Sequence, residues 1–215
     1  MSTCACDGVH DPHKTIVLTG GPGAGKTALL ELVRQSFCAH VKVLPESAGI
    51  LFGGGFPRGT TAVLRRGAQR AIFFTQRELE SIANAADGAI VLCDRGTVDS
   101  VAYWPGPDEF FPSVGTTLAA ELRRYDAVIH LRTPPPGSGY GHSNPLRIET
   151  AEEAHAIDER IFEAWSAHPR RHVIDASTTF LDKAHRALDV LRTELPPCCR
   201  AQIVSALDRT GVGRG

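Results

Sequence analysis

The segment Gly20–Thr27 is rich in glycine and ends in Lys-Thr. It fits the pattern G-x-x-x-x-G-K-[ST] in full, a pattern typical of phosphate-binding loops. Glycines let backbone N–H groups turn inward into an anion nest, and a following helix adds partial positive charge at its N-terminus. We predict that the nucleotide-binding residues are Gly20, Gly21, Pro22, Gly23, Ala24, Gly25, Lys26, Thr27 and Ala28. Lys26 would reach the β- and γ-phosphates, and the Thr27 hydroxyl would bind Mg²⁺.

Two carboxylates follow other short apolar runs. Glu46 comes after Val41–Leu44, and Asp94 comes after Ile90–Cys93. In an open α/β sheet, ligands bind beyond the carboxyl ends of the strands, so both side chains should face the same crevice as the glycine-rich loop. Asp94 could hold Mg²⁺ or accept the proton of an attacking hydroxyl, and Glu46 could do either. The alternative for Asp94 is to cap the next turn, and for Glu46 it is to cap a helix.

Arginines are the candidates for handling phosphate charge. Arg95 directly follows Asp94 and could clamp a phosphate or a substrate hydroxyl, the alternative being a surface ion pair. Arg147 follows a proline- and glycine-rich stretch and could stabilise charge on a transferred phosphoryl group. For Arg160 we expect a solvated ion pair with nearby glutamates. Arg132 could border the nucleotide base.

Short apolar runs alternate with helical patterns along the chain. Five runs are short and bounded by polar residues, glycine or proline, as in strands buried on both faces: Thr15–Thr19, Val41–Leu44, Ala89–Cys93, Ala127–Leu131 and His172–Asp175. Between or after them we predict helices over Thr27–Ala39, Thr60–Ala86, Thr150–Ala167 and Phe180–Glu194. This alternation predicts an α/β fold with a mainly parallel sheet.

Two segments interrupt this alternation. Gly49–Gly59 is rich in glycine and predicts a mobile loop, and Thr133–Pro145 predicts a lid or substrate loop. We expect one domain at residues 14–195, an N-terminal tail at 1–13 and a C-terminal tail at 196–215.

Composition excludes several classes of protein. The 215 residues carry 23 Lys plus Arg against 24 Asp plus Glu, so no global basic field favours nucleic acid. No apolar stretch is long enough to predict a membrane span. The N-terminal residues contain no apolar region of the kind found in signal peptides, so we expect a cytoplasmic protein. Cys38 and Cys93 lie in apolar segments and should be buried. The remaining four cysteines lie near the termini. We expect them to lie in loose tails, the alternative being a metal site: Cys4, Cys6, Cys198 and Cys199.

The long helix predicted over Thr60–Ala86 carries further candidates. Gln69 and Gln76 lie seven residues apart, hence on one face, which could contact a base or sugar or face solvent. The same helix is basic and could attract an anionic substrate or lipid headgroup, or form a solvated face: Arg65, Arg66, Arg70 and Arg77. Among the aromatic residues we expect Phe73, Phe74 and Trp165 in the core and Trp104 in a substrate loop.

Several of these features together resemble the NadR-like P-loop ATPase/kinase family. They are the Gly20–Thr27 loop, the Glu46 strand end and the Asp94-Arg95 pair, joined by the run Asn144-Pro145-Leu146-Arg147-Ile148-Glu149-Thr150-Ala151-Glu152-Glu153-Ala154. The segments Glu163-Ala164-Trp165 and His168-Pro169-Arg170 resemble the branch containing the P-loop domain of an animal protein in TRPL channel trafficking. The resemblance covers about Lys14 to Glu194.

The resemblance implies a three-layer P-loop kinase fold with parallel strand order 2-3-1-4-5. It also implies binding of ATP, or of GTP, with Mg²⁺. Activities in the family include phosphorylation of nicotinamide riboside, and the trafficking branch is described as binding GTP and phosphoinositide. From the residues and the resemblance we predict an ATP-dependent kinase acting on a nucleoside-like hydroxyl acceptor, with Lys26, Asp94, Glu46, Arg95 and Arg147 as its catalytic residues. The alternative is a nucleotide-binding regulatory module that controls a protein or lipid partner.

Overall fold

The computed structural model describes residues 14–38, 40–86, 90–106, 109–135, 150–176 and 180–196. Most of the predicted lid lies outside the described residues, as do Arg147, the terminal cysteines, the N-terminal tail and all but the first residue of the C-terminal tail. The strands are β1 (Lys14–Thr19), β2 (Val41–Leu44), β3 (Ile90–Asp94), β4 (Ala127–Leu131) and β5 (Arg171–Ile174). The helices are α1 (Lys26–Ser36), α2 (Ser47–Gly53), α3 (Ala62–Asn84), η1 (Thr97–Tyr103), α4 (Phe110–Ser113), α5 (Leu118–Leu122), α6 (Ala151–Ala164) and α7 (Phe180–Glu194).

The strands form one sheet in the order β2-β3-β1-β4-β5, and every neighbouring pair is parallel. Leu18 of β1 lies opposite Asp94 of β3, and Thr19 lies opposite His130 of β4. The carboxyl ends of these strands therefore meet at one edge of the sheet. This order confirms the predicted P-loop kinase topology.

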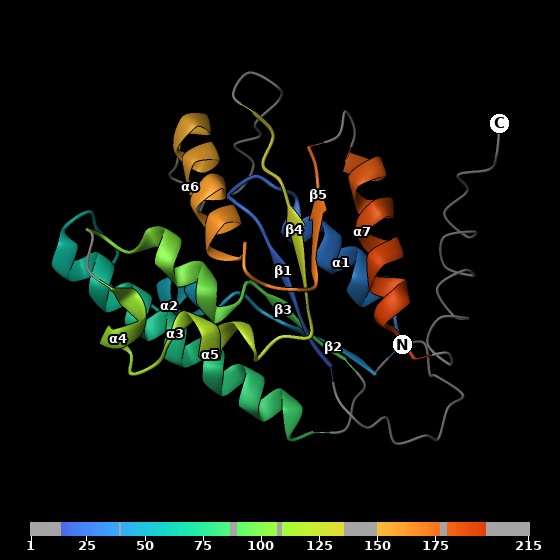
Figure 1. The fold of residues 1–215 in the computed structure, drawn as a ribbon, viewed down its shortest axis with the longest axis horizontal. Coiled ribbons are helices and arrows are strands. Elements are labelled where there is room, and N and C mark those ends of the chain that lie inside the picture. Colours follow the sequence, from blue (N-terminus) through green and yellow to red (C-terminus); the bar gives the residue numbers. More distant parts are fainter. Residues whose placement is uncertain are drawn as a thin grey trace.

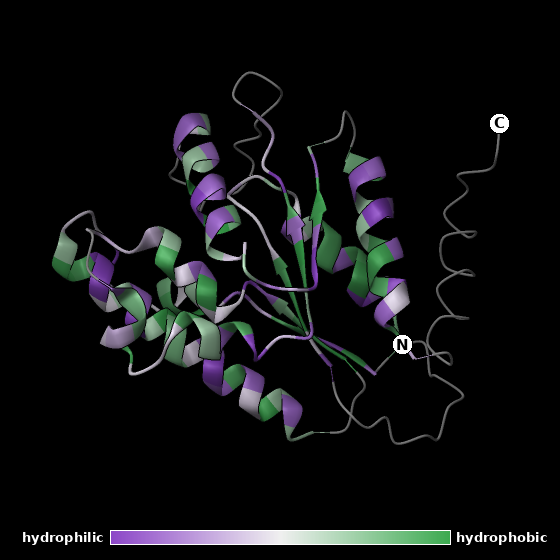
Figure 2. Ribbon diagram, viewed as in Figure 1, coloured by the Kyte–Doolittle hydropathy of each residue, from purple (hydrophilic) through white to green (hydrophobic). Residues whose placement is uncertain are grey.

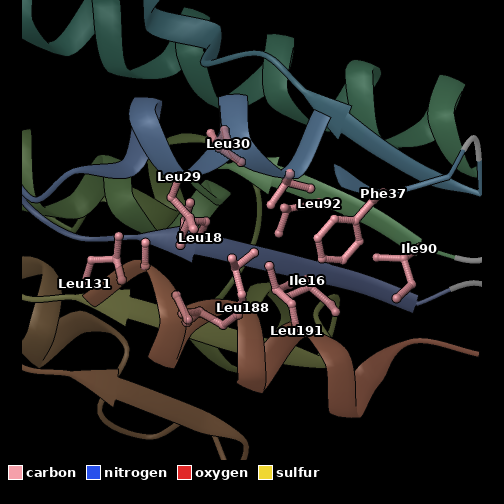
Figure 3. Close-up of a cluster of buried hydrophobic side chains, with 14 of the residues drawn as sticks. Ile16, Leu18, Leu29, Leu30, Phe37, Ile90, Leu92, Leu131, Leu188 and Leu191 are labelled. Carbon is pink, nitrogen blue, oxygen red and sulfur yellow. The ribbon is translucent and has the colours of Figure 1, made fainter. Parts of the chain in front are cut away.

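Helices cover both faces of the sheet, which gives three layers (Figure 1). Successive side chains of a strand point to opposite faces. Ile16 and Leu18 of β1 pack with α1 and α7, whereas Val17 belongs to the cluster that includes Trp165, next to α6. Figure 3 shows the first cluster, in which Leu29 and Leu30 of α1 and Leu188 and Leu191 of α7 meet the strand side chains.

The long helices are amphipathic and carry local start signals. In Figure 2 α7 carries both green and purple segments, and apolar residues of α1 and α7 are buried in the cluster that covers one face of the sheet. Thr61 caps α3 by accepting a hydrogen bond from the N–H of Leu64. Thr150 and Glu153 form a capping box at the start of α6. These signals agree with the predicted helices to within a few residues at each end.

The prediction of a mobile loop at Gly49–Gly59 is wrong in its first half. Residues Ser47–Gly53 form α2, which packs on α3, and the Ser47 hydroxyl donates to Gln76 Oε1 at 2.7 Å. The following glycines end the helix: the Gly54 N–H donates to the Ile50 carbonyl, and Gly55 has a φ of +89° that favours glycine. Packing on α3 thus outweighs the low helix propensity of glycine.

The expectation for aromatic and cysteine burial holds except at one residue. Phe73 and Trp165 are fully buried, and so are Cys38 and Cys93. Phe74 is 52% exposed, because adjacent residues of a helix point about 100° apart and Phe73 takes the inward position. Among the described residues, no helix has the length and hydropathy of a membrane span.

Candidate functional site

The glycine-rich loop joins β1 to α1 at the carboxyl edge of the sheet. Gly20, Gly23 and Gly25 have φ values of +134°, +79° and +98°, which side chains with a Cβ adopt rarely. A Cβ on Gly20 would lie 2.0 Å from the Leu131 carbonyl oxygen, so the close approach of the loop to β4 also requires glycine there. The loop is therefore shaped by its glycines as the pattern predicts.

Lys26 begins α1 and is buried against the loop. Its Nζ donates to the carbonyl oxygens of Gly20 at 2.7 Å and Gly21 at 2.9 Å. Burial and the neighbouring Arg95 cation lower the pKa of Lys26 to about 8, against the attraction of nearby carboxylates. Thr27 and Ala28 follow in the first turn of α1 and are exposed. The loop thus places one ammonium group and one accessible hydroxyl at the helix N-terminus.

Asp94 lies at the carboxyl end of β3, next to the loop strand β1. Burial and the nearby Glu46 carboxylate raise the pKa of Asp94 to about 6, although Lys26 and Arg95 oppose the shift. Its Oδ1 is enclosed and has no hydrogen-bond partner among the described residues. A buried carboxylate oxygen without a donor is an expensive arrangement unless a ligand or ion completes it. In the described part of the chain, no side chain caps η1, the turn that follows Asp94.

Glu46 and Arg95 form an ion pair between the ends of β2 and β3. Arg95 Nε donates to Glu46 Oε1 at 2.7 Å, and the arginine Nη1 donates to the Gly20 carbonyl oxygen at 3.2 Å. Burial opposes ionisation of Glu46, but the Arg95 and Lys26 cations outweigh it and hold the pKa of Glu46 below its ordinary value. The glutamate makes no side-chain capping bond to α2, and the Arg95 side chain is only 14% exposed. The Glu46 side chain therefore does not cap α2, and the pair joins a largely buried arginine to a glutamate that is 38% exposed.

Arg95 has an unusual backbone conformation. Its φ of 72° is the only positive value of a non-glycine residue in the described part of the chain. Strained backbone of this kind persists only where surrounding contacts fix it. The Arg95 N–H donates to the Leu18 carbonyl, and the guanidinium lies 5.6 Å from the centre of the Tyr103 ring. These contacts aim the guanidinium at Glu46 and the loop.

Asp99 is a buried residue of this region that the sequence analysis missed. Both of its oxygens accept from the Thr19 hydroxyl, and Oδ1 also accepts from Trp165 Nε1 at 2.6 Å. The Arg95 Nη1 lies 3.6 Å from Oδ2. Asp99 thus links η1 to β1 through Thr19 and places a carboxylate beside the Arg95 guanidinium. The only hint in the sequence is that Asp99 follows Arg95 by four residues, a spacing of about one helical turn. That spacing alone does not distinguish a buried aspartate from one on the surface.

The other predicted arginines have different partners from those expected. Arg132 pairs with Asp158 and Glu159 and lies 4.4 Å from the Phe162 ring centre, so its charge is satisfied by α6. The solvated ion pair expected for Arg160 is wrong in its partner: Arg160 Nε donates to the Ala102 carbonyl at 2.7 Å and ties α6 to η1. Arg147 lies outside the described residues.

Both glutamines considered as ligand contacts on α3 are buried rather than open to a ligand. Gln69 is buried, and Gln76 donates to Glu80 Oε1 at 2.8 Å while accepting from Ser47. Glu80 also accepts from the Tyr125 hydroxyl, which in turn accepts from the N–H of Thr97. Neither the solvent exposure nor the base contact considered for Gln76 fits this network. The network links α2, α3 and η1 behind Glu46 and Arg95.

A cavity of about 500 Å³ lies farther along η1. Val101, Trp104 and Phe110 contribute to its lining, and Arg66 and Arg70 of α3 lie over the Trp104 ring at 5.5 and 5.9 Å. Trp104 therefore borders a cavity, and its role as a substrate-loop aromatic stays a prediction. Arg66 and Arg70 thus contact an aromatic side chain, and Arg77 of the same helix pairs with Glu121 at 3.0 Å.

The residues around the loop suit magnesium only together with a nucleotide. Among the described residues, no group of three His, Cys, Asp or Glu side chains is placed to hold a metal ion. Mg²⁺ is commonly bound by one or two protein oxygens together with substrate phosphates and water. The unpartnered Asp94 Oδ1 and the exposed Thr27 supply that kind of donor set.

Comparison with known proteins places the chain among P-loop proteins. A model of the AAA domain family matches residues 15–183. No curated protein sequence matches the chain. Among solved structures, NadR protein in complex with NR is 19% identical with a TM-score of 0.64, and the alignment covers 85% of this chain and 51% of that chain. NadR protein in complex with NAD and AMP-PNP is 18% identical with a TM-score of 0.60, and the alignment covers 85% and 49%.

A kinase structure matches this chain over almost the whole of the kinase's own length. Deoxyadenosine kinase from M. mycoides with bound dATP is 14% identical with a TM-score of 0.56, and the alignment covers 83% of this chain and 99% of that chain. The chain spans only about half the length of the NadR structures. The family match and these similarities confirm the predicted fold and the resemblance to NadR-like P-loop proteins.

Proposed function

The chain belongs to the AAA domain family, and we propose that it is a Mg²⁺-dependent kinase that transfers the γ-phosphate of ATP to a hydroxyl group of a nucleoside-like small molecule. The observation that carries this proposal is the Glu46–Arg95 ion pair beside Lys26 and Asp94. A site that only bound nucleotide would need the loop and its lysine. A carboxylate held at a fixed position by an arginine supplies what an attacking hydroxyl requires.

The loop and Lys26 bind the nucleotide phosphates. Lys26 Nζ donates to Gly20 and Gly21 oxygens, and bound phosphate oxygens would take over part of this hydrogen bonding. With a pKa of about 8 the group is mostly charged at neutral pH, so it can balance the charge of the β- and γ-phosphates. The structures with AMP-PNP and dATP support ATP as the nucleotide, and GTP is the alternative.

Asp94 and Thr27 would hold the magnesium ion. When bound, such an ion would supply positive charge that offsets the negative charge of the phosphates. Asp94 fits this role better than that of a base, because its enclosed Oδ1 has no donor and lies beside the phosphate loop. At neutral pH the carboxyl is mostly ionised, since its pKa is about 6.

Glu46 accepts the proton of the attacking hydroxyl. Its side chain is 38% exposed and so can be reached by a substrate, and its lowered pKa keeps it ionised at neutral pH. The acceptor oxygen forms a bond to the γ-phosphorus, the bond to the bridging oxygen of ADP breaks, and the hydroxyl proton passes to Glu46. A weak base suffices because phosphoryl transfer has a loose transition state. Arg95 orients Glu46 and, together with Arg147, which follows the predicted lid, stabilises charge on the transferred group.

The nucleoside-like acceptor is supported by the chemistry of the similar structures, which hold NR or act on a deoxynucleoside. The experiment that tests the proposal measures ADP formation by E46Q and D94N variants with a stimulating acceptor. We expect E46Q to lose turnover while its affinity for Mg-ATP is unchanged, and D94N to raise the Mg²⁺ concentration needed for half-maximal rate. Equal Mg²⁺ requirements in D94N and the unmodified protein would contradict the assignment of Asp94. Full turnover in E46Q would contradict that of Glu46.

A further inference from the structure

Asp158 of α6 lies against the phosphate loop and accepts four hydrogen bonds or ion-pair contacts. Its Oδ1 accepts from the Gly21 N–H at 2.8 Å and contacts His130 Nε2 at 3.0 Å. Its Oδ2 accepts from the Thr133 N–H at 3.2 Å and lies 3.0 Å from Arg132 Nε. The side chain is 0% exposed. A buried carboxylate with this many donors is strongly held in one position.

The contact between α6 and Gly21 leaves no room for another residue. A Cβ on Gly21 would lie 2.7 Å from the Asp158 Cβ, 2.6 Å from Thr133 Oγ1 and 2.8 Å from the Ala154 carbonyl oxygen. The Gly21 N–H is fixed by Asp158, and its carbonyl oxygen is fixed by Lys26. The backbone N–H of Gly21 is therefore bonded to a residue outside the loop, and its backbone carbonyl is bonded to a residue within the loop.

Two neighbouring contacts hold the same side of the loop. The Thr133 hydroxyl donates to the Pro22 carbonyl oxygen at 3.2 Å, and Lys183 Nζ of α7 donates to the Ala24 carbonyl oxygen at 3.0 Å. Thr133 itself is anchored by Asp158. Asp158 thus contacts the loop directly and, through Thr133, a second time. No other described carboxylate accepts from a backbone N–H of the loop.

We propose that Asp158 is a positioning residue that holds the phosphate loop in its binding shape and couples the position of α6 to nucleotide affinity. This inference rests on the proposed nucleotide site. The loop binds the β- and γ-phosphates. Loss of the Asp158 contact therefore lowers the affinity most for ATP, which places both of these phosphates in the loop, less for ADP, and least for AMP. A merely structural role would reduce the fraction of folded protein, which lowers the binding of every nucleotide equally.

The test is displacement of fluorescent mant-ATP by ATP, ADP and AMP from the full chain. We expect D158A to weaken ATP about tenfold, as loss of a charged hydrogen bond would. AMP should change much less. D158N keeps an oxygen that can accept from Gly21 and should recover most of the affinity. E159Q is the matched control, because Glu159 pairs with Arg132 but is half-exposed and makes no contact with the loop.

Two results would overturn the inference. One is unchanged ATP affinity in D158A, and the other is an equal loss for ATP and AMP. If D158A does not fold, D158N decides the matter, because it keeps the shape of Asp158 and an oxygen that can accept from the Gly21 N–H. D158N must then retain most of the ATP affinity of the unmodified protein, and a large loss that is equal for ATP and AMP would contradict the inference. Absence of mant-ATP binding by the unmodified protein would instead contradict the proposed function.

Discussion

Replacing Asp94 with Asn should make the protein more stable while it removes the magnesium-binding carboxylate. The pKa of Asp94 is raised from its ordinary 3.8 to about 6, mainly by burial and by the Glu46 carboxylate. The folded protein therefore binds the Asp94 proton more tightly than the unfolded chain does. The contribution of Asp94 to the free energy of unfolding is therefore most favourable at acidic pH. It falls as the pH rises from about 4 to about 6 and stays at the lower level above that range.

The size of the effect follows from the difference between the two pKa values. The difference between 3.8 and about 6 corresponds to roughly 3 kcal/mol at neutral pH, because each pH unit is worth about 1.4 kcal/mol. Asp94 retains some solvent exposure, so we expect about 1.5 to 3 kcal/mol for D94N. In a domain of this length that gain raises the Tm by roughly 3 to 10 °C.

The assay is urea unfolding of D94N and the unmodified protein at pH 4.5 and pH 7.5, with Tm as a second readout. The stability difference between the two proteins should be full at pH 7.5 and shrink to about a third of that value at pH 4.5, where the unfolded chain is still mostly ionised at this position. D189N is the matched control, because Asp189 is exposed and, among the described residues, pairs with Arg192 one turn away. The reasoning is refuted if D94N is less stable than the unmodified protein at pH 7.5, or if the difference is the same at both pH values.

Further predictions concern the same site. K26A should lower turnover at least a hundredfold and leave the circular dichroism spectrum unchanged; a fully active K26A would contradict the role of Lys26. ATP affinity should be highest between about pH 6 and 8, measured by titration calorimetry, because Asp94 is protonated below about 6 and Lys26 loses its charge above about 8. A flat profile would show that neither group matters. G20A should abolish ATP binding and lower the Tm by several degrees, because its Cβ would lie 2.0 Å from the Leu131 oxygen. R95K should reduce turnover more than ATP affinity, since lysine cannot bond Glu46 and the Gly20 carbonyl with the geometry of a guanidinium; equal losses in both would contradict a role in orienting Glu46.

Much of the fold was predictable because its signals are local. The strand runs are apolar and short, and Val41–Leu44 and Ala127–Leu131 match β2 and β4 to the residue. The phosphate loop was predictable because glycine, lysine and threonine at fixed spacing are required by backbone geometry and phosphate charge. Glu46, Asp94 and Arg95 could be placed at one edge because parallel strands end on the same side.

The features that escaped prediction depend on partners distant in sequence. Gly49 and Gly53 lie in a helix because α2 packs on α3, which no local propensity reports. Gln76 is buried because Ser47 and Glu80 satisfy its amide, although its own sequence position suggests a polar surface. Asp158 lies 137 residues from Gly21, and nothing in the sequence near either residue indicates their contact.

The central claim is that Lys26, Asp94 and Glu46 transfer phosphate from ATP to a small hydroxyl acceptor. The most direct test measures ADP formation from Mg-ATP by the purified protein, with and without a pool of nucleosides that includes nicotinamide riboside. We predict that one acceptor strongly stimulates ADP formation, that a phosphorylated product accumulates in equal amount, and that K26A and E46Q abolish both. Tight ATP binding without stimulation by any acceptor would contradict the kinase and favour a regulatory nucleotide-binding module.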